Sequence, residues 1–181
     1  RQRQMCIRDS GMLSRVHTLA KPDMAAVIFD APGKTFRHEM YPEYKANRPP
    51  MPDDLRVQID PLEKVVAALG WKVLIVPGIE ADDVIGSLSA MAKREGVKSV
   101  VATGDKDLSQ LVDDDVVILN TMNTKFYDRA GVIEKYGVPP ERMIDYLALM
   151  GDKVDNVPGI KGCGPKTAAK CCLLYTSDAA D

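Results

Sequence analysis

Short apolar runs alternate along the chain with longer amphipathic stretches. The apolar runs cover residues 25–29, 73–76, 99–102 and 116–119. A continuously apolar run, without alternation, is typical of a strand that is buried on both faces. The pattern therefore predicts a parallel sheet flanked by helices, an α/β fold.

Two amphipathic stretches between these runs have apolar positions three and four residues apart, which predicts helices over residues 55–69 and 82–94. Pro61 lies inside the first stretch, so we expect that helix to kink there or to restart after Asp60. Gly70 and Gly96 follow the two stretches at the place where glycines commonly end a helix.

The strand patterns stop at about residue 132. Pro139 and Pro140 open a helical stretch that runs to about Leu149, and a polar, glycine-containing loop covers residues 151–159. Pro165 suits the first position of a further helix. This part of the chain is therefore expected to be helical and distinct from the α/β part.

Acidic side chains gather where these elements begin and end. They are Asp30, Glu80, Asp82, Asp83, Asp105, Asp107, Asp152 and Asp155. Clustered carboxylates repel one another unless a cation or hydrogen-bond donors compensate them. Magnesium or manganese prefers such hard oxygen ligands. Because sites in parallel sheets form beyond the carboxyl ends of the strands, ligands from distant positions are expected to converge.

Each acidic pair also has a simpler interpretation. Asp82 and Asp83 could cap a helix, and the pairs at 105–107 and 152–155 could be turn residues that bond to their own backbone. A helix start needs one cap, however, and not three acids with further acids elsewhere. The whole set therefore favours metal binding.

Basic and aromatic residues recur at spacings of three and four between residues 34 and 48. They are Lys34, Arg37, Tyr41, Tyr44, Lys45 and Arg48. On one helical face they would combine phosphate contacts with stacking surfaces, although a solvated charged face is the alternative. Pro42 implies that any helix here is broken or restarted, and the prolines at 49–52 end it.

Glycines at 159, 162 and 164 precede Pro165 and Lys166. Glycine lets backbone N–H groups approach an anion, and a helix N-terminus attracts phosphate. These glycines could equally be turn residues.

Composition narrows the function class only slightly. The net charge is -2, which is not the balance of a strongly basic nucleic-acid binder, although a nuclease can combine acids at its metals with bases on another face. Cys163 and Cys171 are too few for a disulfide framework or a zinc site, so a reducing cytoplasm is expected. No apolar run approaches the length of a membrane span.

The two ends are expected to be foreign to the rest of the chain. DNA that encodes residues 3–10 can be written so that its reverse complement, in another frame, encodes residues 172–178. Such an inverted pair resembles a transposase adapter from sequencing-library preparation. We therefore expect residues 1–10 and 172–181 to be adapter-like, non-native tails. Natural disordered tails are the alternative.

Five motifs stand in order along the remaining chain, and together they resemble one family. They are Val27-Ile28-Phe29-Asp30 with Lys34 to Arg37, Tyr44-Lys45 with Arg48 to Pro52, Glu80 to Asp83, Thr103 to Asp107, and Gly151-Asp152 with Asp155-Asn156. The set is similar to the 5′-nuclease domain of bacterial DNA polymerase I, in the flap-endonuclease superfamily. The resemblance implies a PIN/flap-nuclease-like core over residues 11–131, with a helical arch near 34–56. Residues 132–171 would form a helical part with a truncated helix–three-turn–helix element.

The resemblance also implies an activity. A two-metal phosphodiesterase of this family uses two Mg²⁺ or Mn²⁺ ions to remove 5′ flaps and RNA primers from DNA in the bacterial nucleoid. Its substrates are DNA with 5′ flaps or nicks and RNA primer–DNA hybrids. A polymerase domain can follow in the same chain. The helix–three-turn–helix element often binds K⁺.

The family roles carry over by position. The first metal would be held by Asp30, Glu80, Asp82 and Asp83, and the second by Asp105, Asp107, Asp152 and Asp155. Lys45 and Arg48 would contact the scissile phosphate from the arch. DNA would also contact Lys34, Arg37, Tyr44, Gly159, Gly162, Gly164, Lys166 and Thr167.

One departure from the family concerns its first strand, which ends in an Asp-Gly-Ser that supplies a metal ligand. That strand would lie upstream of Gly11, so we expect this chain, as a fragment, to be a poor enzyme with uncovered apolar sheet surface. Three alternatives remain open. They are a standalone flap endonuclease without a polymerase, a non-catalytic DNA-binding module, and a metal-dependent phosphatase on a similar sheet.

Overall fold

The computed structural model describes the backbone of residues 2–177 and the side chains of residues 11–174. The chain forms two compact units. Unit 1 comprises Arg1–Phe36 and Pro49–Ile85, and unit 2 comprises Arg37–Arg48 and Gly86–Asp181. The predicted tails at residues 1–10 and 172–181 lie largely outside the described side chains.

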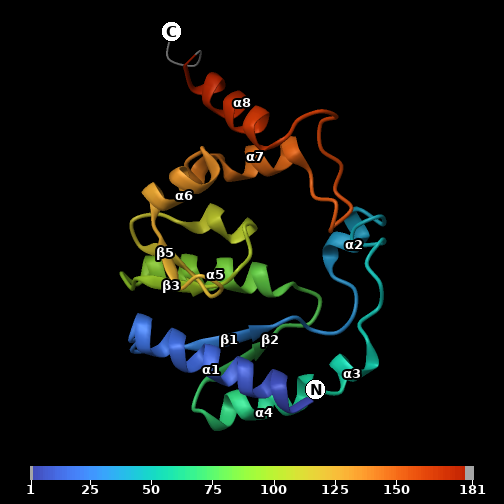
Figure 1. Cartoon of the computed structure of the whole chain (residues 1–181), viewed down its shortest axis with the longest axis vertical. Coiled ribbons are helices and arrows are strands. Elements are labelled where there is room, and N and C mark those ends of the chain that lie inside the picture. Colours follow the sequence, from blue (N-terminus) through green and yellow to red (C-terminus); the bar gives the residue numbers. More distant parts are fainter. Residues whose placement is uncertain (1, 178–181) are drawn as a thin grey trace. The chain divides into compact units, whose positions relative to one another are not determined.

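Unit 1 is built on two parallel strands, β1 (Ala26–Phe29) and β2 (Lys72–Ile75). Helix α4 (Ile59–Ala68) packs against β2, and α1 (Gln2–Ala20) packs against α4 (Figure 1). Val66 of α4 is fully buried between these elements. The predicted parallel pairing and the helical cover are therefore confirmed in this unit.

The helix predicted over residues 55–69 is interrupted earlier than expected. It forms α3 (Asp53–Arg56) and then α4, with the break at residues 57–58. Pro61 lies in the first turn of α4, where its missing N–H would have had no helical partner. Gly70 follows α4 with φ 85°, which is the left-handed conformation expected of a glycine at a helix end.

Unit 2 contains a three-stranded sheet. Strands β3 (Ser99–Ala102) and β4 (Val116–Asn120) are parallel, and β5 (Lys125–Tyr127) pairs antiparallel with β4. The sequence pattern did not predict β5. Helix α5 (Ala81–Arg94) precedes β3, and the division between the units falls within this helix.

The remaining elements of unit 2 are helical, as predicted for residues 132–171. Helix α2 (Phe36–Met40) lies in the first segment of unit 2, apart from Phe36. The second segment contains η1 (Asp107–Leu111), α6 (Arg129–Tyr136), η2 (Pro140–Arg142), α7 (Met143–Met150) and α8 (Pro165–Ser177). Their core includes Val132, Val138 and Met143, whose side chains are fully buried. Pro165 begins α8, as its position in the sequence indicated.

The strands differ in how deeply they are buried. Four of the five residues of β4 are buried, whereas no residue of β1 or β2 is. The expectation of burial on both faces therefore holds for β4 and is wrong for β1, β2 and β3, since only Val101 of β3 is buried. The described strands form two separate sheets rather than one, so less of their surface is covered.

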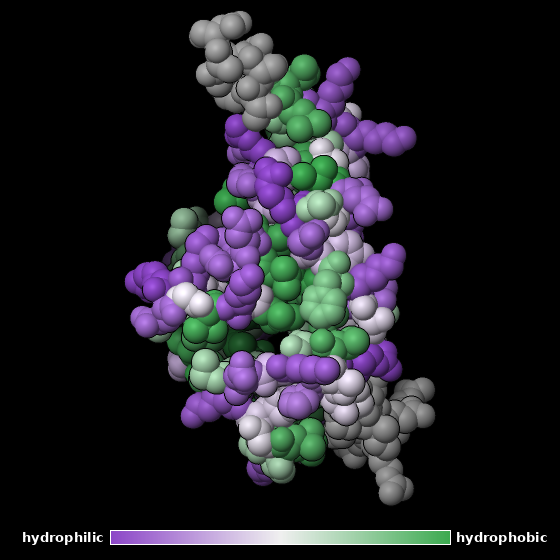
Figure 2. All heavy atoms as spheres, turned by 90° about the vertical axis from the view of Figure 1, so that its left-hand side faces the viewer, coloured by the Kyte–Doolittle hydropathy of each residue, from purple (hydrophilic) through white to green (hydrophobic). Residues whose placement is uncertain are grey.

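Apolar side chains also remain on the surface, where Figure 2 shows them in green among purple polar ones. Met24, Met40 and Ile144 are exposed examples. Within the described residues, none of the helices has both the length and the apolar character needed to cross a membrane.

Candidate metal and nucleic-acid site

The first acidic group consists of Asp30, Glu80, Asp82 and Asp83, all in unit 1. Asp30 directly follows β1, and the other three lie at the start of α5. The backbone N–H of Ala81 donates a hydrogen bond of 2.7 Å to Oδ1 of Asp30. This bond fixes the end of β1 against the start of α5.

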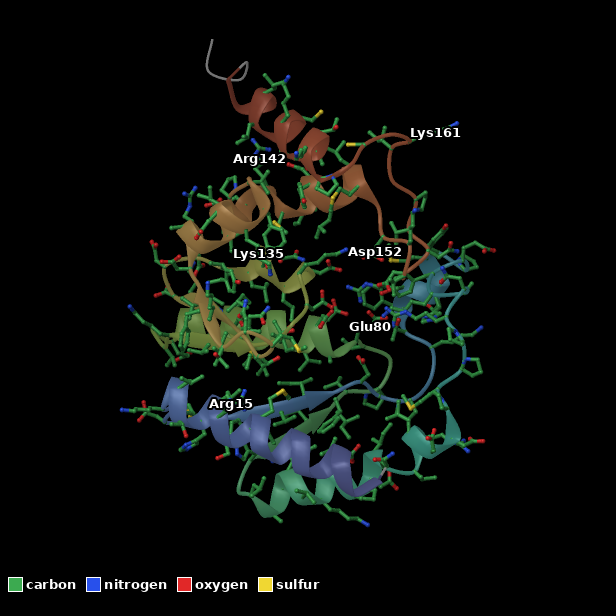
Figure 3. All side chains as sticks on the ribbon, in the orientation of Figure 1. Arg15, Glu80, Lys135, Arg142, Asp152 and Lys161 are labelled. Carbon is green, nitrogen blue, oxygen red and sulfur yellow. The ribbon has the colours of Figure 1, made fainter. Side chains whose placement is uncertain are left out.

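Glu80, labelled in Figure 3, is unusual among these acids because it is buried. The hydroxyl of Thr35, also buried, donates a long hydrogen bond of 3.4 Å to Oε1 of Glu80. The positive end of the α5 dipole adds favourable potential for Asp82 and Asp83, which lie in its first turn. These uncharged donors and the helix dipole contribute to the compensation of this group. Thr35 was not among the predicted site residues.

The second acidic group consists of Asp105, Asp107, Asp152 and Asp155, all in unit 2. Asp105 follows β3, and its Oδ1 accepts a bond of 2.9 Å from the N–H of Asp107. Oδ1 of Asp152 accepts bonds from the N–H groups of Val154 at 2.7 Å and Asp155 at 3.2 Å. The turn interpretation is thus confirmed for Asp105 and Asp152. It uses one oxygen of each carboxylate.

Asp107 differs from the other acids of this group in its surroundings. Its Oδ1 is buried and has no hydrogen-bond partner among the described residues. Burial and then the charge of Asp105 raise the pKa of Asp107 from 3.8 to about 6; the charge of Lys106 opposes this increase, and those of Asp152 and Asp155 add to it. A buried carboxylate oxygen without a donor, among three like charges, has the environment that a divalent cation would stabilise.

Two cationic side chains compensate Asp152 and Asp155 of the second group. The ammonium of Lys106 donates a bond of 2.7 Å to Oδ2 of Asp152, and Arg48 forms an ion pair with Asp155. The Lys106 bond lowers the pKa of Asp152. Partial burial opposes protonation of Lys106, but its bond to Asp152 and the nearby acids raise its pKa. The sequence analysis missed Lys106, although it stands between two predicted ligands.

Among the described side chains, no three His, Cys, Asp or Glu residues lie close enough together to bind a metal ion. The metal-ligand roles of both acidic groups therefore remain predictions. In unit 2 the carboxylates bond to Lys106 and Arg48 instead.

The segment between residues 36 and 48 is less helical than one continuous face would require. Helix α2 ends at Met40, before Pro42, and a series of turns follows. The six basic and aromatic residues therefore do not share one helical face, as the prolines had indicated. Tyr44 is buried, and the ammonium of Lys45 lies 4.8 Å from the centre of its ring.

Loop 151–159 lies between α7 and α8, and Figure 3 labels Asp152 on it. Asp152 and Val157 exchange two backbone hydrogen bonds of 2.8 Å, which close the loop into a small hairpin. A Cβ on Gly159 would lie 2.3 Å from the backbone of Met150, so only glycine fits there. For Gly159 the structure thus shows a close backbone approach, whereas phosphate binding remains a prediction.

The glycine-rich segment continues into α8. The N–H of Ala168 bonds to the carbonyl of Gly164 at 2.9 Å, which starts the helix there. Lys166 and Thr167 lie exposed in the first turn. Gly162 is also exposed. These positions agree with the predicted helix start, and their DNA contacts remain a prediction.

Comparisons with known proteins cover nearly the whole chain. A family model described as the 5′-3′ exonuclease N-terminal resolvase-like domain matches residues 4–137, and one described as the 5′-3′ exonuclease C-terminal SAM fold matches residues 138–177.

Two relatives represent the curated matches. DNA polymerase I of Pseudomonas aeruginosa is 55% identical over 161 residues, which cover 87% of this chain and 18% of that protein. A 5′-3′ exonuclease of Aquifex aeolicus is 45% identical over 170 residues, which cover 92% of this chain and 59% of that protein. The chain therefore spans less than two thirds of the length of these relatives.

Solved structures show the same fold at low sequence identity. The T5 D15 protein co-crystallized with metal ions has a TM-score of 0.78 at 20% identity, over 94% of this chain and 68% of that chain. The catalytic core of Rad2 in complex with DNA substrate has a TM-score of 0.58 at 19% identity, over 92% of this chain and 52% of that chain. Together with the matching family models, these findings show that the chain belongs to the 5′-3′ exonuclease family.

Proposed function

We propose that this chain provides the metal-dependent nuclease part of a 5′-3′ exonuclease and 5′-flap endonuclease that acts on DNA. The environment of Asp107 carries the proposal. A buried oxygen without a donor, among Asp105, Asp152 and Asp155, suits a divalent cation and serves no evident purpose in a purely structural loop. Relatives named 5′-3′ exonuclease and DNA polymerase I support the same function.

Both acidic groups would hold metal ions, two Mg²⁺ or Mn²⁺ in all. When bound, such ions supply a hydroxide nucleophile and stabilise charge during phosphodiester hydrolysis. The first group would offer Asp30, Glu80, Asp82 and Asp83 from fixed positions around the start of α5. The second would offer Asp105, Asp107, Asp152 and Asp155 after Lys106 and Arg48 give up their bonds to the carboxylates.

The cationic side chains of unit 2 would act on the nucleic acid. Lys45 and Arg48 would contact the scissile phosphate, where fixed positive charge stabilises the developing negative charge. Arg37 and Tyr44 of unit 2, and Lys34 of unit 1, would contact the adjoining strand. Such contacts position the backbone and carry no sequence preference, so DNA shape would determine which substrate is cut.

The segment from Gly159 to Thr167 would grip duplex phosphates as a helix–three-turn–helix element, with K⁺ as a candidate ion. Substrates would be DNA with 5′ flaps or nicks and RNA primer–DNA hybrids in the bacterial cytoplasm. We further propose that a polymerase domain belongs to the same whole protein, as in the Pseudomonas relative. The Aquifex relative, named only as a 5′-3′ exonuclease, favours the alternative of a standalone nuclease.

A chimera tests this function. In it, residues 11–171 replace the matching segment of the Pseudomonas DNA polymerase I. The chimera should cut a labelled 5′-flap substrate near the flap junction with Mg²⁺ and should be inactive in EDTA. Flap binding without Mg²⁺-dependent cutting would instead support a non-catalytic DNA-binding module.

A further inference from the structure

Two segments far apart in the sequence are tied together within unit 2. The side-chain amide of Asn47 donates a bond of 2.7 Å to the carbonyl of Lys153, and that of Asn156 donates one of 2.8 Å to the carbonyl of Glu43. The backbone N–H of Lys45 donates a third, of 2.9 Å, to the carbonyl of Asp155. We call these three bonds the neutral tie.

The backbone at the neutral tie has a specific conformation. Lys45 has φ 56° and Asn156 has φ 59°, both in the left-handed region. Asparagine tolerates that region, whereas lysine enters it rarely. The bond from the N–H of Lys45 to Asp155 therefore compensates a conformation that Lys45 would not adopt alone. Two of the three carbonyl acceptors, those of Lys153 and Asp155, belong to the small hairpin that Asp152 and Val157 close, and the third is that of Glu43.

The neutral tie differs from the ionic contacts that join the same segments. Arg48 pairs with the carboxylate of Asp155, and a metal ion at that carboxylate would compete with it. The three neutral bonds end on backbone carbonyls and leave every carboxylate available. They can therefore persist after Arg48 releases Asp155.

We infer that Asn47 and Asn156 are positioning residues for the cleavage reaction. By holding residues 43–48 on the loop of residues 153–156, they keep Lys45 and Arg48 beside Asp155 while that carboxylate exchanges its partner. This inference rests on the proposed function. Neither asparagine contacts substrate in this role.

Amide hydrogen exchange of the 181-residue chain tests the tie itself. Asn156→Gly removes the donor but keeps a residue that accepts positive φ. It should speed exchange of the Lys45 N–H by about fivefold, since one hydrogen bond of ordinary strength is lost. Asn123→Gly is the matched control, because Asn123 is an exposed asparagine of unit 2 outside the tie, and it should change this exchange by less than about twofold.

Steady-state cleavage by the chimera tests the positioning role. Asn156→Gly and Asn47→Ala should each lower kcat by about five- to tenfold with KM changed less than about twofold, because Lys45 and Arg48 act mainly on the transition state. Asn47→Gln keeps an amide donor and should restore part of the rate. Asn123→Gly should be indistinguishable from the parent.

The outcomes separate the two proposals. Unchanged Lys45 exchange in Asn156→Gly, or faster exchange with an unchanged kcat, would overturn the positioning role. A parent chimera that never cuts the flap would overturn the proposed function and the catalytic part of this inference. Hydrogen exchange would then still decide whether the tie exists.

Discussion

The described contacts of the two acidic groups differ in kind. In unit 1, the backbone N–H of Ala81, the hydroxyl of Thr35 and the dipole of α5 face the carboxylates. In unit 2, the charged groups of Lys106 and Arg48 bond to Asp152 and Asp155. Fixed dipoles need not move when a metal ion arrives, whereas bound cations must leave. The described contacts of the first group could therefore stay in place when a metal ion binds, whereas the second group would have to exchange one cation for another.

Removing one acid from each group tests whether both groups belong to the catalytic centre. Asp83→Ala and Asp105→Ala should each lower Mg²⁺-dependent flap cleavage by the chimera by at least about 100-fold, because neither group can hold its ion normally. Asp114→Ala, an exposed acid outside both groups, is the control. If either variant kept a tenth or more of the parent rate, that group would not be part of the catalytic centre.

Loss of Lys45 tests whether the reaction needs the phosphate-contacting segment. Lys45→Ala should slow cleavage by about 100-fold, since it removes a positive charge from the transition state. Lys98→Ala removes an exposed lysine of the same unit and should have little effect. Full activity of Lys45→Ala would favour the phosphatase alternative, which has no use for this lysine.

The pH dependence of stability should distinguish the second group. The pKa of Asp107 is about 6 in the folded chain against 3.8 ordinarily, so its favourable contribution is complete below about pH 4 and is lost as the pH rises through 6. In EDTA at pH 8, Asp107→Asn should therefore stabilise the chain by about 1 kcal/mol, a figure reduced for solvent screening.

Urea unfolding of the 181-residue chain at pH 5 and pH 8 measures this effect. The gain should shrink at pH 5, where Asp107 is largely protonated, and Asp114→Asn should show no such dependence. An Asp107→Asn variant less stable than the parent at both pH values would mean that an unseen donor already satisfies this carboxylate.

The smallest effect is expected from the hydrogen bond between Thr35 and Glu80 in the first group. Thr35→Val removes the hydroxyl that bonds to Glu80 and should lower the free energy of unfolding by about 0.5–1 kcal/mol, because the bond is long. The loss should be independent of salt. Thr35→Ser, which keeps the hydroxyl, is the control. A loss that vanished in high salt would show that an ionic interaction at Glu80 had been removed instead.

Local sequence patterns predicted much of this fold. The strand at residues 99–102 has the predicted bounds, and Pro165 begins a helix where its fixed φ fits. Strand β5 was missed because three residues that include a lysine give too short and too polar a pattern. Its pairing with β4 comes from a hairpin that no apolar periodicity marks.

The site was predictable as a set of acids but not as a set of contacts. Lys106 and Asp152 are far apart in the chain, as are Asn47 and Lys153, so only folding brings each pair together. Residue type alone also could not separate Asp107, whose oxygen is buried without a donor, from Asp105, which closes a turn.

The most direct test of the central claim is the binding of Mn²⁺ to the 181-residue chain, followed by electron paramagnetic resonance at pH 7.5. We predict that the parent binds two Mn²⁺ ions and that Asp107→Asn weakens the binding of one of them by about tenfold or more, while Asp114→Asn leaves both unchanged. Equal binding by parent and Asp107→Asn would contradict the assignment of the second acidic group as a metal site.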